Sequence, residues 1–233
     1  MSAYENGGAA MAQVGEWDGG AGEAEDRAAA LALHPVSRET EERLDLLAYE
    51  LRRWQEVKNL VGPGTLEAVW TRHIADSLQL LDIVPEAKSW VDLGSGAGFP
   101  GLVLGIAALE RDGMRVDLVE SNGRKCAFLR HVARLTGAPV AVHQARLEDV
   151  IGRFAGSDVV TARALAPLSR LLASAEPLLT TGTTGLFPKG REVEGELTEA
   201  AKSWRFEAEL VPSRTDSAAR IVRIHSLKAR GSP

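Results

Sequence analysis

A glycine-rich segment constrains the fold of this chain more than any other feature. It reads Val91-Asp92-Leu93-Gly94-Ser95-Gly96-Ala97-Gly98-Phe99-Pro100-Gly101. Apolar residues typical of a strand lead into it, and Pro100 suits the first turn of a helix, where a missing N–H costs nothing. Glycine lets the backbone turn sharply and approach a ligand closely, while the helix start offers free N–H groups. The segment therefore predicts a strand, a loop and a helix that bind a nucleotide-like cofactor through Gly94, Gly96 and Gly98.

Downstream of residue 89, short strand-like segments alternate with segments of helical periodicity. Strands are expected near 89–93, 115–120, 139–144, 157–162 and 183–187, and helices near 100–109, 123–136, 167–179 and 193–203. Two more strands, near 206–211 and 220–226, follow without a helix between them and predict an antiparallel hairpin. Repeated strand–helix units form parallel sheets covered on both faces. The prediction is an α/β fold with a doubly wound, mostly parallel seven-stranded sheet, similar to the Rossmann-like class I methyltransferases.

The first part of the chain has a different character. Residues 1–34 are rich in Gly, Ala and Glu without a sustained apolar period, which predicts a disordered acidic tail. Ser37 is a predicted N-cap for a helix, and the turn at 62–64 separates that helix from a second one near 65–82. We therefore expect an N-terminal helical cap over residues 35–85 and a cofactor-binding domain over residues 86–233.

Two cofactors fit the glycine-rich segment. Residues 96–101 also match the G-x-G-x-x-G fingerprint of dinucleotide-binding proteins, and Glu120 ends the second strand where an acid would bind ribose hydroxyls. Asp92, two residues before Gly94, is typical of methyltransferase loops, and the chain has no obvious second domain for a hydride acceptor. These features favour S-adenosylmethionine, with NAD(P) as the alternative.

The second predicted helix carries polar residues on an apolar face. Its apolar arc at helical spacing comprises Leu66, Val69, Trp70, Ile74, Leu78, Leu80 and Leu81. His73 and Ser77 fall inside that arc, Asp76 borders it, and Arg72 lies on the polar side. A buried polar group without a partner costs about 1–3 kcal/mol, so His73 needs either a structural partner or a pocket.

Two basic residues follow the fourth and fifth predicted strands. Arg163 and Lys189 lie at the carboxyl edge, where open α/β sheets bind ligands. A guanidinium group suits carboxylate or phosphate, so Arg163 is a candidate for cofactor or RNA contact, with a salt bridge as the alternative. Lys189 is equally well explained as an RNA contact or as a solvated loop lysine.

Charge and composition narrow the possible partners. The net charge is -5, but residues 1–34 hold six acids and one base, which leaves 26 of each sign over residues 35–233. The broad basic field of a strong nucleic-acid binder is therefore missing, and RNA contact would need a local surface. Residues 202–230 are the candidate surface, with a solvated edge strand and tail as the alternative. Basic residues outnumber acidic ones in this stretch: Lys202, Arg205, Arg214, Arg220, Arg223, Lys228 and Arg230 compared with Glu207, Glu209 and Asp216.

The remaining composition limits the location and the metal chemistry. Cys126 is the only cysteine, which argues against disulfides and a cysteine-based zinc site, and we expect no metal. No apolar run reaches membrane-spanning length, and the N-terminus lacks the basic start and apolar stretch of a signal peptide. We expect a cytoplasmic monomer that does not bind membranes.

Several motifs together resemble the RsmG (GidB) family of bacterial 16S rRNA (guanine-N7) methyltransferases. They are Gly94 to Gly101, Leu118-Val119-Glu120-Ser121 with Lys125 and Phe128-Leu129-Arg130, Asn59-Leu60, Arg72-His73 with Asp76-Ser77-Leu78, and Val159-Val160-Thr161 with Arg163-Ala164. The resemblance covers roughly residues 40–230. Gln55, Val61 and Ala162 depart from residues common in the family.

The resemblance implies a site and a substrate. The resemblance implies cofactor contacts at Gly94, Phe99, Leu147, Glu148 and Arg163. It makes Asn59, Arg72, His73, Asp76 and Ser77 candidates for the substrate pocket. The implied substrate is a guanine in the decoding-site loop of 16S rRNA, as free RNA, 30S subunit or assembly intermediate.

The residues also bear on the kind of methyl acceptor. Guanine N7 has an in-plane lone pair and no proton, so no catalytic side chain is expected as a general base. Methylation at cytosine C5 needs a nucleophilic cysteine, whereas Cys126 lies among apolar residues of a predicted helix. The Asn/Asp-Pro-Pro-aromatic loop common in adenine amino-group methylation is missing, so a ring nitrogen is favoured. The alternatives are an NAD(P)-dependent oxidoreductase and a non-catalytic RNA- or ribosome-binding protein on the same fold.

Overall fold

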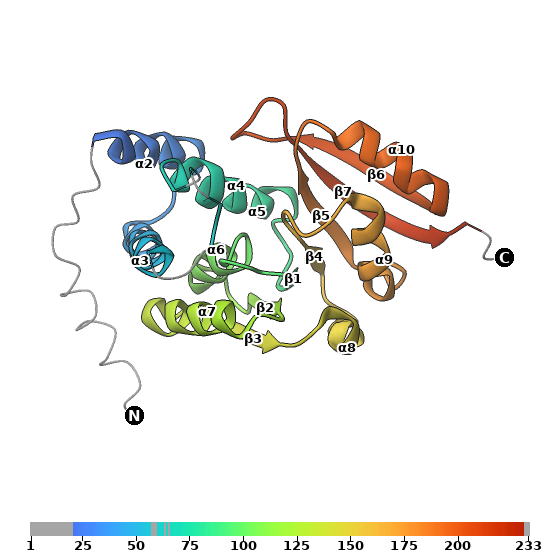
Figure 1. Ribbon diagram of the computed structural model, residues 1–233, viewed down its shortest axis with the longest axis horizontal. Helices are drawn as coiled ribbons and strands as arrows, with labels where there is room; N and C mark the ends of the chain where they lie inside the picture. The colour runs from blue at the N-terminus through green and yellow to red at the C-terminus, as the bar shows by residue number, and fades with distance from the viewer. Residues whose placement is uncertain (1–20, 57–59, 63, 65, 231–233) are drawn as a thin grey trace.

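Seven strands form one mixed sheet in the computed structural model, which describes residues 21–56, 60–62, 64 and 66–230 (Figure 1). The strands are β1 Ser89–Leu93, β2 Arg115–Glu120, β3 Val140–Gln144, β4 Val159–Thr161, β5 Thr184–Lys189, β6 Trp204–Pro212 and β7 Arg220–Ala229. Their order is β3-β2-β1-β4-β5-β7-β6, with β1 to β5 parallel and β7 antiparallel to both of its neighbours. The predicted doubly wound sheet with a closing hairpin is confirmed.

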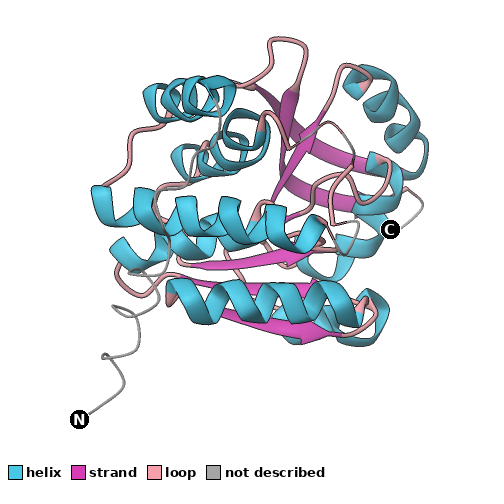
Figure 2. Ribbon diagram, turned by 60° about the vertical axis from the view of Figure 1, so that its left-hand side comes forward, coloured by secondary structure: helices cyan, strands magenta, loops and turns pink. Residues whose placement is uncertain are grey.

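Helices cover both faces of this sheet (Figure 2). The helical elements are α2 Ala21–Leu33, α3 Arg38–Gln55, the π-helix η1 Trp70–Ala75, α4 Asp76–Leu78, α5 Leu80–Ile83, α6 Gly101–Ala107, η2 Ala108–Glu110, α7 Gly123–Thr136, α8 Leu147–Val150, η3 Ile151–Phe154, α9 Leu168–Leu179 and α10 Val193–Ser203.

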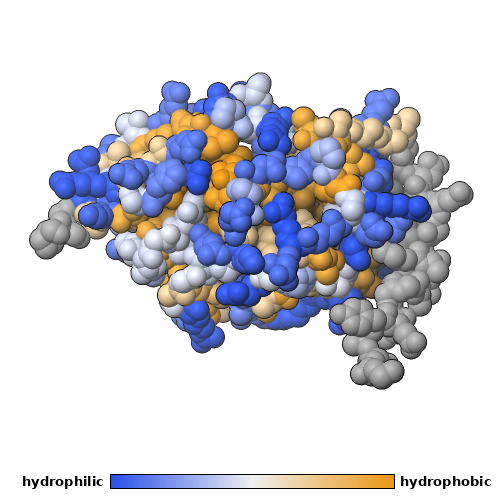
Figure 3. Space-filling view, turned by 180° about the vertical axis from the view of Figure 1, so that it is seen from behind, coloured by the Kyte–Doolittle hydropathy of each residue, from blue (hydrophilic) through white to orange (hydrophobic). Residues whose placement is uncertain are grey.

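Alternate residues of β1 supply the two halves of the core. Trp90 packs into a cluster with residues of α3, η1, α6 and α7, whereas Val91 and Leu93 pack with α9, α10 and β7. All three side chains are fully buried. This alternation is what a strand with helices on both faces requires. The outer surface intersperses polar and apolar side chains (Figure 3).

Helix α3 begins at the residue that the sequence predicts. Ser37 is the N-cap of α3, where its side chain accepts a 3.1 Å hydrogen bond from the amide of Thr40, as predicted. Leu44, Leu47 and Leu51 of α3 are fully buried against the sheet domain.

Two predictions for this region are wrong. The disordered tail was expected to reach residue 34, but residues 21–33 form α2; residues 1–20 lie outside the described part of the chain. Ion pairs of Arg27 with Asp45 and of Glu23 with Arg52 hold α2 on α3, and composition alone does not reveal such partners. The helix expected over 65–82 is instead a π-helix followed by two short α-helical segments.

The topology also decides where a site can form. β1 lies between β2 and β4: the chain runs outward from β1 through β2 to β3 on one side and then crosses back to β4 on the other, so the strand order reverses beside β1. Open α/β sheets bind ligands at such a switch point, outside the carboxyl ends of the strands. Because β6 runs parallel to β5, the loop after β6 reaches the same edge.

Candidate cofactor and substrate site

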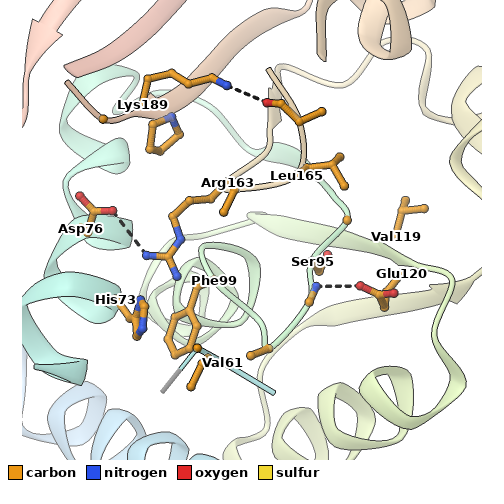
Figure 4. A pocket seen from close by; sticks show the side chains of 18 of the residues that line it. Val61, His73, Asp76, Ser95, Phe99, Val119, Glu120, Arg163, Leu165 and Lys189 are labelled. Atoms are coloured by element: carbon orange, nitrogen blue, oxygen red, sulfur yellow. Dashed lines mark hydrogen bonds and ion pairs between the residues drawn. The ribbon is translucent and has the colours of Figure 1, made fainter. Parts of the chain in front are cut away.

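One large pocket of about 1870 Å³ opens at this carboxyl edge. Its walls come from the loops after β1, β2, β3, β4 and β5, from η1, and from the loop after β6. Figure 4 shows Glu120 on one side of the pocket and His73, Asp76 and Arg163 on the other, with Phe99 between them. The pocket therefore joins the predicted cofactor residues to the predicted substrate residues.

Two glycines of the loop face this pocket. Gly94 and Gly96 have left-handed backbone, with φ of +65° and +57°. A Cβ at Gly96 would meet no protein atom closer than the Gly94 carbonyl at 3.7 Å, so it would project into the pocket. At Gly94 a Cβ would lie 2.6 Å from Leu165 Cδ1. Gly96 thus leaves room for a ligand, whereas a side chain at Gly94 would first meet Leu165, which also lines the pocket.

Gly98 has a different role from the one predicted. It is missing from the pocket lining, and a Cβ there would lie 2.5 Å from Leu102 Cδ1 in α6. Its φ is +92°. Gly98 therefore allows the turn to pack on the helix and does not line the pocket.

Glu120 fixes the loop through both carboxylate oxygens. Oε2 accepts a 2.9 Å hydrogen bond from the amide of Gly96, and Oε1 accepts one of 2.8 Å from the amide of Asn122. Glu120 is only 9% exposed and lines the pocket. Each oxygen has a second lone pair, so the carboxylate can accept hydrogen bonds from ribose hydroxyls.

Asp92 lies below the loop. It is fully buried, and Oδ2 accepts a 3.0 Å hydrogen bond from the amide of Gly101, which starts α6. Burial raises the pKa of Asp92 to about 7. Asp92 thus joins the end of β1 to the start of α6 and sets the span of the glycine loop.

His73 stacks on Phe99 at the opposite wall. The ring centroids are 4.8 Å apart with an interplanar angle of 24°. No described residue is a hydrogen-bond partner of either imidazole nitrogen. Burial, with the positive charges of Arg163 and Arg72, lowers the pKa of His73 to about 3. Of the two predicted alternatives, a structural hydrogen-bond partner or a position in a pocket, the structure favours the pocket, which His73 lines as a neutral side chain.

Arg163 lies between the helical cap and Phe99. Its guanidinium donates a 2.8 Å hydrogen bond to the carbonyl of Arg72, lies 3.6 Å from Asp76 Oδ2, and sits 5.3 Å from the centroid of Phe99 (Figure 4). The next residue, Ala164, has φ +52°, a strained value for a residue with a Cβ. The loop after β4 is therefore held in an unusual conformation beside the glycine loop.

Asp76 connects Arg163 to a loop that the sequence did not indicate. Its Oδ1 accepts 2.8 Å hydrogen bonds from the Thr215 hydroxyl and from the Gln79 side chain. Gln79 also accepts a 2.9 Å bond from the amide of Arg214. The contacts of Thr215 with Asp76 and of Arg214 with Gln79 were missed because each joins distant parts of the chain. The available signal was the hairpin, whose loop must lie at one edge of the sheet.

The remaining predicted residues differ in their relation to the pocket. Arg72, Leu147 and Glu148 line the pocket, whereas Ser77 does not and donates a 2.5 Å hydrogen bond to the carbonyl of His73. Lys189 lines the pocket but is paired, 2.8 Å from both Glu196 Oε2 and the carbonyl of Ala166, so the solvated-lysine interpretation is wrong. Asn59 lies outside the described residues.

The basic stretch over residues 202–230 is partly neutralised. Lys202, Arg214 and Arg223 pair with Glu199, Asp82 and Glu209. In the described part of the chain, no group of three or more His, Cys, Asp and Glu side chains is arranged as a metal site. Nor does any described helix have the length and apolarity needed to cross a membrane.

Solved structures with the same fold include methyltransferases. A putative O-methyltransferase from Klebsiella pneumoniae superimposes with a TM-score of 0.58 at 13% identity, over 88% of this chain and 97% of the other. An O-methyltransferase from Bacillus cereus in complex with SAH gives 0.56 at 14% identity, over 87% and 97%. At this identity the similarity establishes the fold.

Sequence relatives are much closer. Ribosomal RNA small subunit methyltransferase G from Methylobacterium radiotolerans is 67% identical over 88% of this chain and 96% of its own length. The protein of the same name from Methylorubrum populi is 65% identical over 86% and 95%. A family model described as rRNA small subunit methyltransferase G matches residues 40–221. The chain thus belongs to the rRNA small subunit methyltransferase G family.

Proposed function

We propose that this chain transfers the methyl group of S-adenosylmethionine to N7 of a guanine in small-subunit rRNA. Membership of the family decides between the two cofactors in favour of S-adenosylmethionine. The single observation that carries the choice of acceptor is the wall formed by His73, Phe99 and Arg163, which offers aromatic contact without an available base.

The cofactor half of the pocket fits S-adenosylmethionine. The Glu120 carboxylate lines the pocket with lone pairs that can accept from ribose hydroxyls, and the room at Gly96 allows close approach of a ligand to the backbone. Leu147 gives an apolar contact for the adenine, with Glu148 at its rim. When bound, the cofactor supplies an electrophilic methyl group on a positively charged sulfur.

The substrate half supports a ring nitrogen as acceptor. His73 is a weak base because burial keeps its pKa near 3. The Asp76 carboxylate is engaged by Thr215, Gln79 and Arg163. Guanine N7 needs no deprotonation before it attacks, so positioning the base in line with the methyl group is the main task of these side chains.

Unpaired basic side chains support an RNA substrate. Arg72, Lys125, Arg146 and Arg170 line the pocket and form no ion pair with a described residue. Such cations suit the phosphates that flank a target base. The distinction between free rRNA, 30S subunit and assembly intermediate is part of the test.

The test is methyl transfer with labelled S-adenosylmethionine to rRNA from a strain that lacks this modification. Free 16S rRNA, 30S subunits and an assembly precursor are assayed in parallel, and cleavage at N7-methylguanine maps the product. We expect one modified guanine in the decoding-site loop. Label on another atom, or no transfer by protein that binds S-adenosylmethionine, would contradict the proposal.

A further inference from the structure

We infer that helix α2 positions the substrate wall by capping the π-helix η1 from outside, with Asp26 as the positioning residue. This inference rests on the proposed function for its activity readout only. The segment that matches the family model begins at residue 40, so α2 lies upstream of it.

Asp26 satisfies the free amides at the start of η1. Oδ2 accepts a 2.8 Å hydrogen bond from the amide of Trp70, and Oδ1 accepts one of 3.2 Å from the amide of Thr71. Oδ1 also accepts a 2.5 Å hydrogen bond from the Thr71 hydroxyl. First-turn amides have no partner within their own helix, and η1 has no side-chain cap from its own N-cap residue, Val69. A carboxylate 44 residues upstream takes that role.

Neighbouring residues of α2 hold Asp26 in place. The Arg27 guanidinium forms two 2.8 Å hydrogen bonds to Asp45 of α3 and sits 5.1 Å from the centroid of Trp70. One turn earlier, Glu23 pairs with Arg52 of α3 at 2.5 Å. The helix is therefore fixed to α3 on one side and to η1 on the other.

The capped helix carries the substrate wall. Arg72 lies directly after the two capped residues, and its carbonyl accepts the hydrogen bond from Arg163. His73 follows and stacks on Phe99, and Asp76 pairs with Arg163 just beyond η1. A π-helix is rarer and wider than an α-helix, so an external cap that fixes its start also fixes the direction of these groups.

The test compares Asp26→Ala with Glu25→Ala as a matched control. Glu25 carries the same charge, lies next to Asp26 in α2, and is exposed. For Asp26→Ala we expect a roughly tenfold lower kcat/KM for rRNA and unchanged affinity for S-adenosylmethionine. We also expect hydrogen exchange of the Trp70 and Thr71 amides to accelerate by about tenfold. Glu25→Ala should match the wild type in all three measurements.

Two milder variants keep the test decisive if Asp26→Ala does not fold. Asp26→Asn keeps the shape and one acceptor, and Thr71→Val removes only the hydroxyl bond; both should give intermediate losses. Folded Asp26 variants with wild-type kcat/KM and wild-type exchange would overturn the inference. So would a fall in kcat/KM that is fully explained by a smaller folded fraction, measured by circular dichroism on the same preparations. If the wild type itself transfers no methyl group while exchange still accelerates in Asp26→Ala, the proposed function fails and the cap stands.

Discussion

Glu120 and Gly96 are joined by a 2.9 Å hydrogen bond from a backbone amide to a carboxylate. The acid at the end of β2 thereby holds the loop after β1, and the same carboxylate faces the pocket. One side chain thus shapes the loop and presents a carboxylate to the pocket, where we propose that it accepts from the ribose, so changes at Glu120 should affect cofactor binding before they affect the fold.

Glu120→Gln tests this dual role. The side-chain amide of glutamine must point its NH₂ group at the backbone N–H of either Gly96 or Asn122, where two donors oppose each other. It also loses the charge-assisted hydrogen bonds of the carboxylate, which are worth about 1.5–3 kcal/mol. We expect the Kd for S-adenosylmethionine, measured by calorimetry, to rise by roughly ten- to a hundredfold. Asp149→Asn, an exposed acid outside the pocket, is the control. A change below threefold at Glu120 would remove it from the ribose site.

Gly96→Ala and Gly98→Ala should separate binding from folding. At Gly96 the new methyl group projects into the pocket and left-handed strain adds about 1–2 kcal/mol, so cofactor affinity should fall by tenfold or more with a modest loss of stability. At Gly98 it meets Leu102, so thermal stability should fall more while the folded protein keeps its affinity within a few-fold. The opposite order would mean that the two faces of the loop are assigned the wrong way round.

The buried His73 should make stability depend on pH. Its pKa falls from an ordinary 6.5 to about 3 in the folded protein, so the unfolded chain binds this proton more readily. The contribution is complete above pH 6.5 and is lost progressively as the pH falls toward 3. Between pH 8 and pH 5 the wild type should lose roughly 2 kcal/mol more than His73→Phe in denaturant unfolding. Equal losses in both proteins would show that His73 is charged, or solvated, in the fold.

Lys189→Met should destabilise the protein rather than weaken RNA binding uniformly. The side chain is 9% exposed and contacts Glu196 and the carbonyl of Ala166, so its removal leaves both without their cation. We expect a loss of about 1–3 kcal/mol in unfolding free energy and an unchanged salt dependence of rRNA binding. A shallower salt dependence with full stability would instead assign Lys189 to a phosphate.

Local patterns made the sheet and the cofactor loop predictable. The Gly94 loop and the cap at Ser37 each depend on residues a few positions apart. Glu120 lies 24 residues after Gly96, and its place at the end of the next strand made it predictable. The mostly parallel sheet follows from the repeated strand–helix units with right-handed crossovers, whereas the order of its strands comes from the structure.

Interactions between distant segments account for what the sequence did not reveal. Helix α2 depends on Asp45 and Arg52, and the environment of Lys189 depends on Glu196. Thr215 reaches Asp76 from a hairpin 139 residues away. None of these pairs leaves a periodic pattern in the sequence, so charge and spacing alone could not identify them.

The position of β7 has a consequence for synthesis of the protein. It leaves the ribosome after β1 to β6, yet it lies inside the sheet between β5 and β6, with Val222 and Ile224 fully buried. While those residues are still in the exit tunnel, β5 has an open edge and β6 has no partner strand. The hairpin loop that carries Thr215 cannot yet close on the helical cap. A nascent chain of this enzyme therefore cannot complete its active site until β7 has left the ribosome, and until then β5 presents an open edge of the kind that favours edge-to-edge aggregation.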